Sequence, residues 1–177
     1  RPSEQLVILS DLKVGQLGAG NPESVRMGFD QNMGSMYPFS LAEKLQAITE
    51  DHEYYHDANR DALPWEKPVV PLEMISVLTQ YTSGLSGYRS RGPAIGLFAG
   101  QEIKLINGPI FVDHPYKLER EIVALSESKR TESNWIKTKV IDEVSEQLVA
   151  EVILNSATLK DSYEKYEEDA RALGLNV

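Results

Sequence analysis

Hydrophobic positions recur at two different spacings along the chain, and they predict a helical first half and a β-rich second half. Ser40 and Glu43 have the spacing of a capping box, and the apolar residues that follow Ser40 return at helical intervals as far as Ile48. A helix of three turns or more is therefore expected there. A second and more apolar helix is expected over Leu72–Tyr81, just after a proline. Its composition indicates that it is buried.

After the second helix the pattern changes to that of β-strands separated by turn residues. The expected strands cover 94–98, 102–106, 116–126, 134–142 and 147–159. An earlier strand is expected over Glu23–Phe29, after an irregular N-terminal segment that covers 1–22. Residues 160–177 are expected to contain a charged C-terminal helix, over Tyr163–Leu173, that ends at Gly174.

The order of these elements favours one packing. In the last strand Ala150, Val152 and Leu154 give one fully apolar face, as expected of a sheet that covers a helix. An antiparallel β-sheet wrapped around a central α-helix lets each element bury the apolar face of the other. This is the α+β hot-dog fold. The sequence shows no internal repeat and no linker, so residues 1–177 are expected to form a single domain.

Composition and charge exclude several classes of function. The 177 residues include no cysteine, which excludes disulfides, thiolate metal sites and a cysteine nucleophile. The chain has 18 basic and 27 acidic residues and a net charge of -9, which argues against a nucleic-acid partner. No apolar run approaches the roughly 20 residues that span a bilayer, and no targeting segment is visible. We therefore expect no membrane association and a cytoplasmic location.

Two of the three histidines lie in one acidic segment, which has two incompatible interpretations. His52-Glu53-Tyr54-Tyr55-His56 is an H-E-x-x-H string, which on a helix would hold zinc between two imidazoles and use the glutamate to activate water. Glu73 is a conceivable third ligand. Against zinc, the flanking residues are acidic and polar, and no further histidine lies nearby. We expect no metal.

The other interpretation begins with Asp51, His56 and Ala62, whose spacing resembles the motif of MaoC-like dehydratases and R-specific enoyl-CoA hydratases. That family has the hot-dog fold. Glu53-Tyr54 replaces its usual Asn-Pro, and Ala58 replaces its second Asp. Further segments resemble the family's entry, the approach to its central helix, a strand pair and the closing hairpin; they cover 10–15, 67–74, 100–121 and 133–159.

The resemblance implies roles for individual residues. Asp51 and His56 would serve as the base and the acid and would hold one water between them. The backbone N–H of Leu72, just after Pro71, would stabilise charge on the thioester oxygen. Further candidates are Tyr55 and Trp65 for the acyl pocket and Arg89 and Arg91 for phosphate groups. As alternatives, the aromatic residues only pack against the helix and the arginines are ordinary loop residues. His56 would then be a surface residue and Asp51 a carboxylate at the end of a helix.

Three functions from different classes follow. The first is an acyl-thioester hydratase or dehydratase, without a cofactor, that acts on a 2-enoyl thioester of coenzyme A or acyl carrier protein. The second is a non-catalytic acyl-binding subunit, which the altered Asn-Pro positions favour. The third is a zinc hydrolase that uses the H-E-x-x-H string. A homodimer, or a heterodimer with a related hot-dog domain, is expected because such sheets continue across subunits.

Overall fold

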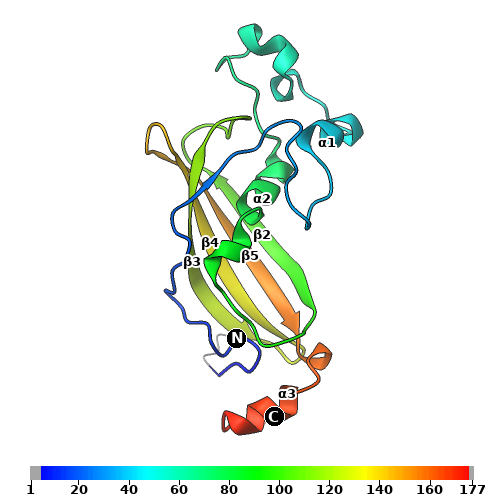
Figure 1. Cartoon of the computed structure of the whole chain (residues 1–177), viewed down its shortest axis with the longest axis vertical. Coiled ribbons are helices and arrows are strands. Elements are labelled where there is room, and N and C mark those ends of the chain that lie inside the picture. The colour runs from blue at the N-terminus through cyan, green and yellow to red at the C-terminus, as the bar shows by residue number, and fades with distance from the viewer. Residues whose placement is uncertain (1–4, 176–177) are drawn as a thin grey trace.

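The computed structural model describes residues 5–175, and these form a five-stranded antiparallel sheet that curves around a central helix (Figure 1). The order across the sheet is β1-β3-β4-β5-β2. The strands are β1 (Glu23–Val25), β2 (Gly96–Leu105), β3 (Tyr116–Glu127), β4 (Thr131–Asp142) and β5 (Leu148–Leu159). The helices are α1 (Leu41–Ala47), α2 (Leu72–Gln80) and α3 (Tyr166–Ala172), with short 3-10 turns η1 (Glu53–Tyr55), η2 (Asp57–Ala62), η3 (Ser83–Ser86) and η4 (Lys160–Ser162). This architecture confirms the expected α+β hot-dog fold.

The main core lies between α2 and the sheet. Met74, Ile75 and Leu78 are fully buried on α2, in one cluster with inward-facing residues of β3, β4 and β5 such as Leu118 and Val152. Burial of each side chain of this size stabilises the folded state by about 1.5–3 kcal/mol relative to an exposed side chain. The apolar periodicity of this helix therefore identified the central element correctly.

The first predicted strand and helix are shorter in the structure than in the prediction. β1 ends at Val25, and the chain then leaves the sheet, so that the Phe29 carbonyl accepts a hydrogen bond from the Ala42 N–H. The capping box at Ser40 is present. α1 nevertheless has only seven residues, because Ile48 already adopts an extended conformation.

Two elements predicted in the second half of the chain also have different boundaries in the structure. The strands predicted over 94–98 and 102–106 are one strand, β2, with a bulge between Phe98 and Gly100 that leaves Ala99 without a partner in the register. The C-terminal helix begins at Tyr166 instead of Tyr163, because the turn η4 comes first. Gly174 has a φ of +72°, as expected of a residue that ends a helix. Residues 1–4 and 176–177 of the predicted terminal segments lie outside the described residues.

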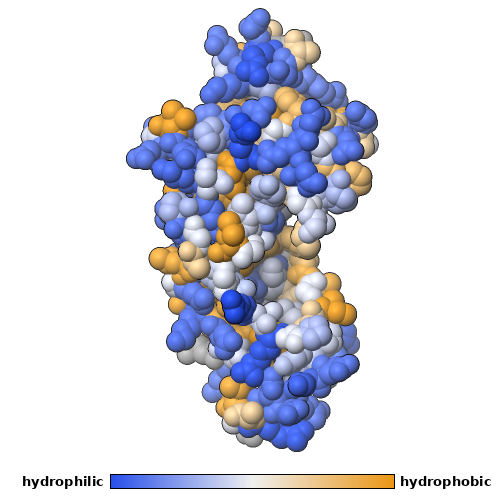
Figure 2. Space-filling view, in the orientation of Figure 1, coloured by the Kyte–Doolittle hydropathy of each residue, from blue (hydrophilic) through white to orange (hydrophobic). Residues whose placement is uncertain are grey.

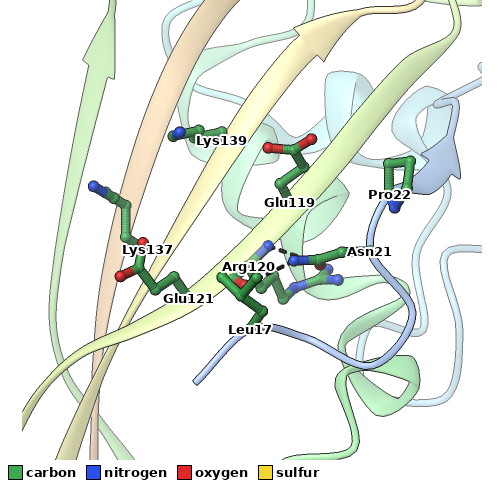
Figure 3. Close-up of a pocket in the computed structure, with 8 residues that line it drawn as sticks. All are labelled: Leu17, Asn21, Pro22, Glu119, Arg120, Glu121, Lys137 and Lys139. Atoms are coloured by element: carbon green, nitrogen blue, oxygen red, sulfur yellow. Dashed lines mark hydrogen bonds between the residues drawn. The ribbon is translucent and has the colours of Figure 1, made fainter. Parts of the chain in front are cut away.

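The two edges of the sheet differ. On the β3 side the N-terminal segment continues the pairing: Gly15 N–H bonds to Ile122 O, and Gly18 N–H bonds to Arg120 O. The Asn21 side chain bonds to both backbone groups of Arg120 (Figure 3). On the other side, β2 has no further strand beyond it among residues 5–175, and all its residues except Ile103 are exposed. β2 is therefore a free edge that can pair with another chain.

A buried ion pair fixes the C-terminal end of α2. Arg120 on β3 and Glu23 on β1 are both almost completely buried and in contact. Arg120 also donates a hydrogen bond to the Thr79 carbonyl at 2.6 Å, and the Thr82 hydroxyl donates to Glu23 at 2.5 Å. A cation at the carbonyl end of a helix is favoured by the helix dipole. The network therefore ties the central helix to two strands.

A second buried carboxylate joins the two ends of the chain. Glu132 accepts hydrogen bonds from the backbone N–H groups of Val7 and Leu9, at 2.9 and 3.0 Å, and from the Tyr166 hydroxyl at 3.0 Å. These groups lie beside a second apolar cluster that includes Ile8 and Ile122. The N-terminal segment and α3 are thereby held at the same end of the sheet (Figure 1).

Candidate functional site

The segment that holds Asp51, His52 and His56 is not a regular helix. His52 and His56 are both extended, with φ of -141° and -109°, and each caps a short 3-10 turn. The Nδ1 atom of His52 accepts a hydrogen bond from the Tyr54 N–H at 3.2 Å. The helix on which the zinc interpretation depends is therefore absent, and the described residues contain no group of three side chains that could hold a metal ion.

Asp51 and His56 form a hydrogen-bonded pair. His56 Nε2 lies 2.6 Å from Asp51 Oδ1, and the same oxygen accepts the backbone N–H of His52 at 2.9 Å. The hydrogen bond from His56 is the main reason that the pKa of Asp51 lies below its usual value. An ionised carboxylate can only accept, so with neutral His56 the shared proton is on Nε2 and the lone pair is on Nδ1.

This geometry differs from the one that the family resemblance implies. The side chains contact each other directly, so no water lies between Asp51 Oδ1 and His56 Nε2. A reacting water would instead bind Asp51 Oδ2 or His56 Nδ1. The Asp51 side chain is 56% exposed and the His56 side chain 36% exposed. Within this one chain the pair is open to solvent, and the surrounding upper end of the molecule is mainly hydrophilic (Figure 2).

Backbone hydrogen bonds connect this segment to the start of α2. The Val69 N–H donates to the Tyr54 carbonyl at 2.7 Å, and the Val70 N–H donates to the Ile110 carbonyl at 2.8 Å. Pro71 then caps α2, and Leu72 is its first residue, with a side chain that is 54% exposed. The histidine-containing segment and the first N–H groups of α2 therefore lie at the same end of the fold (Figure 1).

The two aromatic residues predicted for an acyl pocket lie in different environments. Tyr55 packs against the main core, on the inner side of η1. Trp65 is 42% exposed and makes ring contacts with Tyr54 and Phe111, at centroid distances of 5.7 and 6.0 Å. Trp65 and Phe111 thus form a partly exposed aromatic surface near the segment that precedes α2. Tyr55 instead anchors the histidine-containing segment to the main core.

Arg91 lies beside α3, at the end of the molecule opposite to the histidine-containing segment (Figure 1). Arg91 donates to Asp169 Oδ2 at 2.9 Å and to the Ser10 hydroxyl at 3.0 Å, close to α3. Arg89 is exposed in the loop before it. The hydrogen-bond partners of Arg91 are thus Asp169 and Ser10, and neither belongs to the histidine-containing segment.

The structure also contains a second histidine–aspartate pair. His114 Nε2 lies 2.7 Å from Asp142 Oδ2, and Lys67 Nζ lies 3.4 Å from His114 Nδ1. Burial acts to raise the pKa of Asp142, but hydrogen bonds from the N–H groups of Ser145 and Val144 and from His114 outweigh it, so the pKa is lowered. The sequence alone indicates only a turn residue at His114, between Asp113 and Pro115. The pairing of β3 with β4, which places Tyr116 opposite Asp142, was the signal that could have revealed the contact.

A hollow of about 220 Å³ lies on the outer face of the sheet (Figure 3). Its lining residues are Leu17, Asn21, Pro22, Glu119, Arg120, Glu121, Lys137 and Lys139. Glu119 is paired in register with Lys139, and Glu121 with Lys137, so the acidic and basic side chains balance. None of these residues belongs to the histidine-containing segment or to α2.

Comparisons with solved structures show what the fold resembles. A chain of the HadBC (3R)-hydroxyacyl-ACP dehydratase complex of Mycobacterium tuberculosis matches with a TM-score of 0.61 and 14% identity, over 81% of this chain and 96% of that one. A MaoC-like dehydratase from Rhodospirillum rubrum matches with a TM-score of 0.57 and 12% identity, over 87% and 97%. The (R)-hydratase from A. caviae matches with a TM-score of 0.52 and 24% identity, over 82% and 96%.

These likenesses establish that the chain shares its hot-dog fold with MaoC-like dehydratases and an (R)-hydratase. No protein-family model matches the sequence, and neither does any curated protein sequence. Among the described residues, no helix has the length and apolar character needed to cross a membrane.

Proposed function

We propose that this chain is a cytoplasmic (R)-specific hydratase or dehydratase that adds water to, or removes it from, a 2-enoyl thioester of coenzyme A or acyl carrier protein. The observation that carries the proposal is the hydrogen-bonded pair of Asp51 and His56, connected to the start of α2 in a hot-dog fold. An aspartate and a histidine at this distance can exchange a proton with a bound water and with a carbon acid.

The reaction needs one proton removed from water and one delivered to the α-carbon. Asp51 Oδ1 already accepts the Nε2 proton of His56, so the carboxylate orients the imidazole and stabilises the imidazolium that forms when Nδ1 takes a proton. In the hydration direction His56 Nδ1 accepts the proton of water as the oxygen attacks the β-carbon, and the His56 imidazolium then gives a proton to the α-carbon, which restores the imidazole. No oxidant or metal takes part.

Charge that develops on the thioester oxygen needs a hydrogen-bond donor. The first N–H groups of a helix have no partner within the helix, and the helix dipole favours negative charge there. The Leu72 N–H occupies this place in α2, because Pro71 is the N-cap. A donor of this kind typically contributes a factor of about 10²–10³ to the rate. The exposed side chain of Leu72, with Trp65, would border the acyl group.

We further propose that the active form is a dimer, with itself or with a related hot-dog domain, joined along β2. Phe98 is 65% exposed on this free edge, and two further apolar residues of β2, Leu97 and Leu105, are also exposed. A long apolar edge strand is unfavourable unless it is covered. Because Arg91 is already bound to Asp169, Arg89 is the predicted arginine that remains available for a phosphate group of the substrate.

A second candidate function is a non-catalytic subunit that binds the acyl chain for a catalytic partner. The observation that favours it is the direct contact of Asp51 with His56, which excludes the bridging water that the family resemblance implies. A heterodimer would then place the working pair on the other subunit.

The test is the hydration of crotonyl-coenzyme A by the purified, metal-free chain, followed by the loss of enoyl absorbance. We expect activity in the parent and a loss of about 10²–10⁴-fold in both Asp51→Asn and His56→Ala, with folding retained because both side chains are exposed. Inactivity of the parent on short and long enoyl thioesters would reject the hydratase and favour the binding subunit.

A further inference from the structure

We infer that Lys67 is a site of acyl transfer: its amine can be acylated directly by an acyl thioester, with His114 as the general base and Asp142 as the residue that orients it. The inference rests on the proposed function only for the supply of thioesters near the site. It concerns a different group of residues and a different reaction from hydration.

The arrangement is that of a nucleophile, a base and an orienting carboxylate. Lys67 Nζ lies 3.4 Å from His114 Nδ1, and His114 Nε2 lies 2.7 Å from Asp142 Oδ2. The two hydrogen bonds fix the tautomer: Nε2 donates its proton to the carboxylate, so Nδ1 carries the lone pair that faces the amine. This is the order of roles by which a weak nucleophile is activated in covalent catalysis.

The base and the carboxylate are shielded from solvent. The side chain of His114 is only 12% exposed and that of Asp142 17%, far less than in the pair formed by His56 and Asp51. Asp142 is also held by the N–H groups of Val144 and Ser145, at 2.8 and 2.9 Å. The imidazole therefore has a fixed position, and an imidazolium formed there would be stabilised by a carboxylate that remains in place.

The amine is likewise held in place, beside an apolar surface. Lys67 Nζ lies 5.5 Å from the centre of the Phe111 ring, which in turn contacts Trp65. The cation–π contact favours the ammonium form by about 0.5–1 kcal/mol, so transfer of its proton to His114 is needed before attack. The aromatic surface offers an apolar contact for the acyl group of the incoming thioester.

The step balances without any further reactant. His114 Nδ1 takes a proton from the Lys67 ammonium, and the neutral amine attacks the carbonyl carbon of the thioester. A C–N bond forms and the C–S bond breaks, which gives a thiolate and an amide nitrogen that still carries one proton too many. The thiolate takes this second proton and leaves as the thiol, and the His114 imidazolium gives the first proton to water, which restores the imidazole.

Lys67 lies in the segment that connects η2, just after His56, with the start of α2. Pro68 and Val69, which follow it, are bonded to the loop before β3 and to η1: the Pro68 carbonyl accepts from Val112 N–H, and the Val69 N–H donates to Tyr54 O. A thioester that reaches the start of α2 would therefore pass close to the amine. Acylation would remove the charge of Lys67 and its contact with Phe111.

Acetyl-coenzyme A is the suitable probe, because it has no double bond and cannot be hydrated. The full-length protein is incubated with it at mildly alkaline pH, and the rate of acetylation at each lysine is measured by mass spectrometry of peptides. Lys129, exposed in the turn between β3 and β4, serves as the internal reference. We expect Lys67 to react at least about tenfold faster than Lys129.

Two variants separate activation by His114 from simple exposure. His114→Gln keeps a polar side chain but has no basic nitrogen, and it should lower the rate at Lys67 to that of Lys129 while the rate at Lys129 itself stays constant. Lys67→Arg should abolish the fast phase. Equal rates at Lys67 and Lys129 in the parent, or a fast phase that survives His114→Gln, would overturn the inference. Crotonyl-coenzyme A hydration in the same samples reports on the proposed function separately.

Discussion

The buried pair of Arg120 and Glu23 allows a quantitative test of how the sheet holds the central helix. Arg120→Met removes the guanidinium but keeps most of the side-chain volume. The variant leaves the Glu23 carboxylate buried without its cation, which costs about 3–5 kcal/mol. It also removes the donor to the Thr79 carbonyl at the end of α2, for about 1–3 kcal/mol more. The expected loss is about 4–8 kcal/mol, a large part of the stability of an ordinary domain.

The double variant Arg120→Met/Glu23→Met gives the contrasting result. Glu23 Oε1 and Arg120 Nε are both buried without a hydrogen-bond partner, so the native pair does not fully offset its own desolvation. Replacing both residues by apolar ones should therefore cost less than Arg120→Met alone, because no uncompensated charge remains. We expect a coupling energy of at least about 2 kcal/mol between the two sites.

Urea unfolding followed by circular dichroism measures the free energies for the parent, both single variants and the double variant. Additive losses in this cycle would refute the reasoning, since they would mean that the two side chains do not interact energetically. A double variant less stable than Arg120→Met would contradict it in the same way.

Three further predictions rest on single contacts. His56→Ala should raise the pKa of Asp51 toward its usual value, because the hydrogen bond from His56 is the main cause of the lowered pKa; NMR titration of the carboxyl carbon measures this, and an unchanged midpoint would count against the pair. Glu132→Ala should cost about 3–6 kcal/mol in urea unfolding, because it leaves two buried N–H groups and the Tyr166 hydroxyl without their acceptor, whereas a loss below about 1 kcal/mol would show that water replaces it. Phe98→Glu on β2 should shift the proposed dimer to monomer in light scattering, whereas Val144→Glu, 74% exposed in the β4–β5 turn, should not; dimers in both variants would rule out the β2 edge as the interface.

The fold was predictable from local patterns because its largest elements carry them. The apolar repeat of α2 and the one-sided face of β5 each specify which side is buried, and the buried residues Met74 and Val152 confirm both. The lengths of the elements were less predictable. β1 is short because the chain turns away to reach α1, and such long-range contacts leave no periodic signal in the sequence.

The site was only partly predictable. The family resemblance implied that Asp51 and His56 act together with one water between them, and the structure brings the two side chains together. Their roles stay a proposal. The direct contact without a bridging water depends on the extended conformations around η1, which the motif does not specify. His114 and Asp142 were missed because they are 28 residues apart and meet only through the register of β3 and β4.

The central claim is that His56, through its contact with Asp51, transfers protons during hydration. The most direct measurement compares kcat/KM for crotonyl-coenzyme A in His56→Gln and His52→Asn. His56→Gln keeps a donor toward Asp51 but cannot transfer a proton, whereas His52→Asn keeps the acceptor that caps the Tyr54 N–H. We predict a loss of at least about 100-fold for His56→Gln and a rate close to that of the parent for His52→Asn. Near-parental activity in His56→Gln, or an equal loss in both variants, would contradict the account.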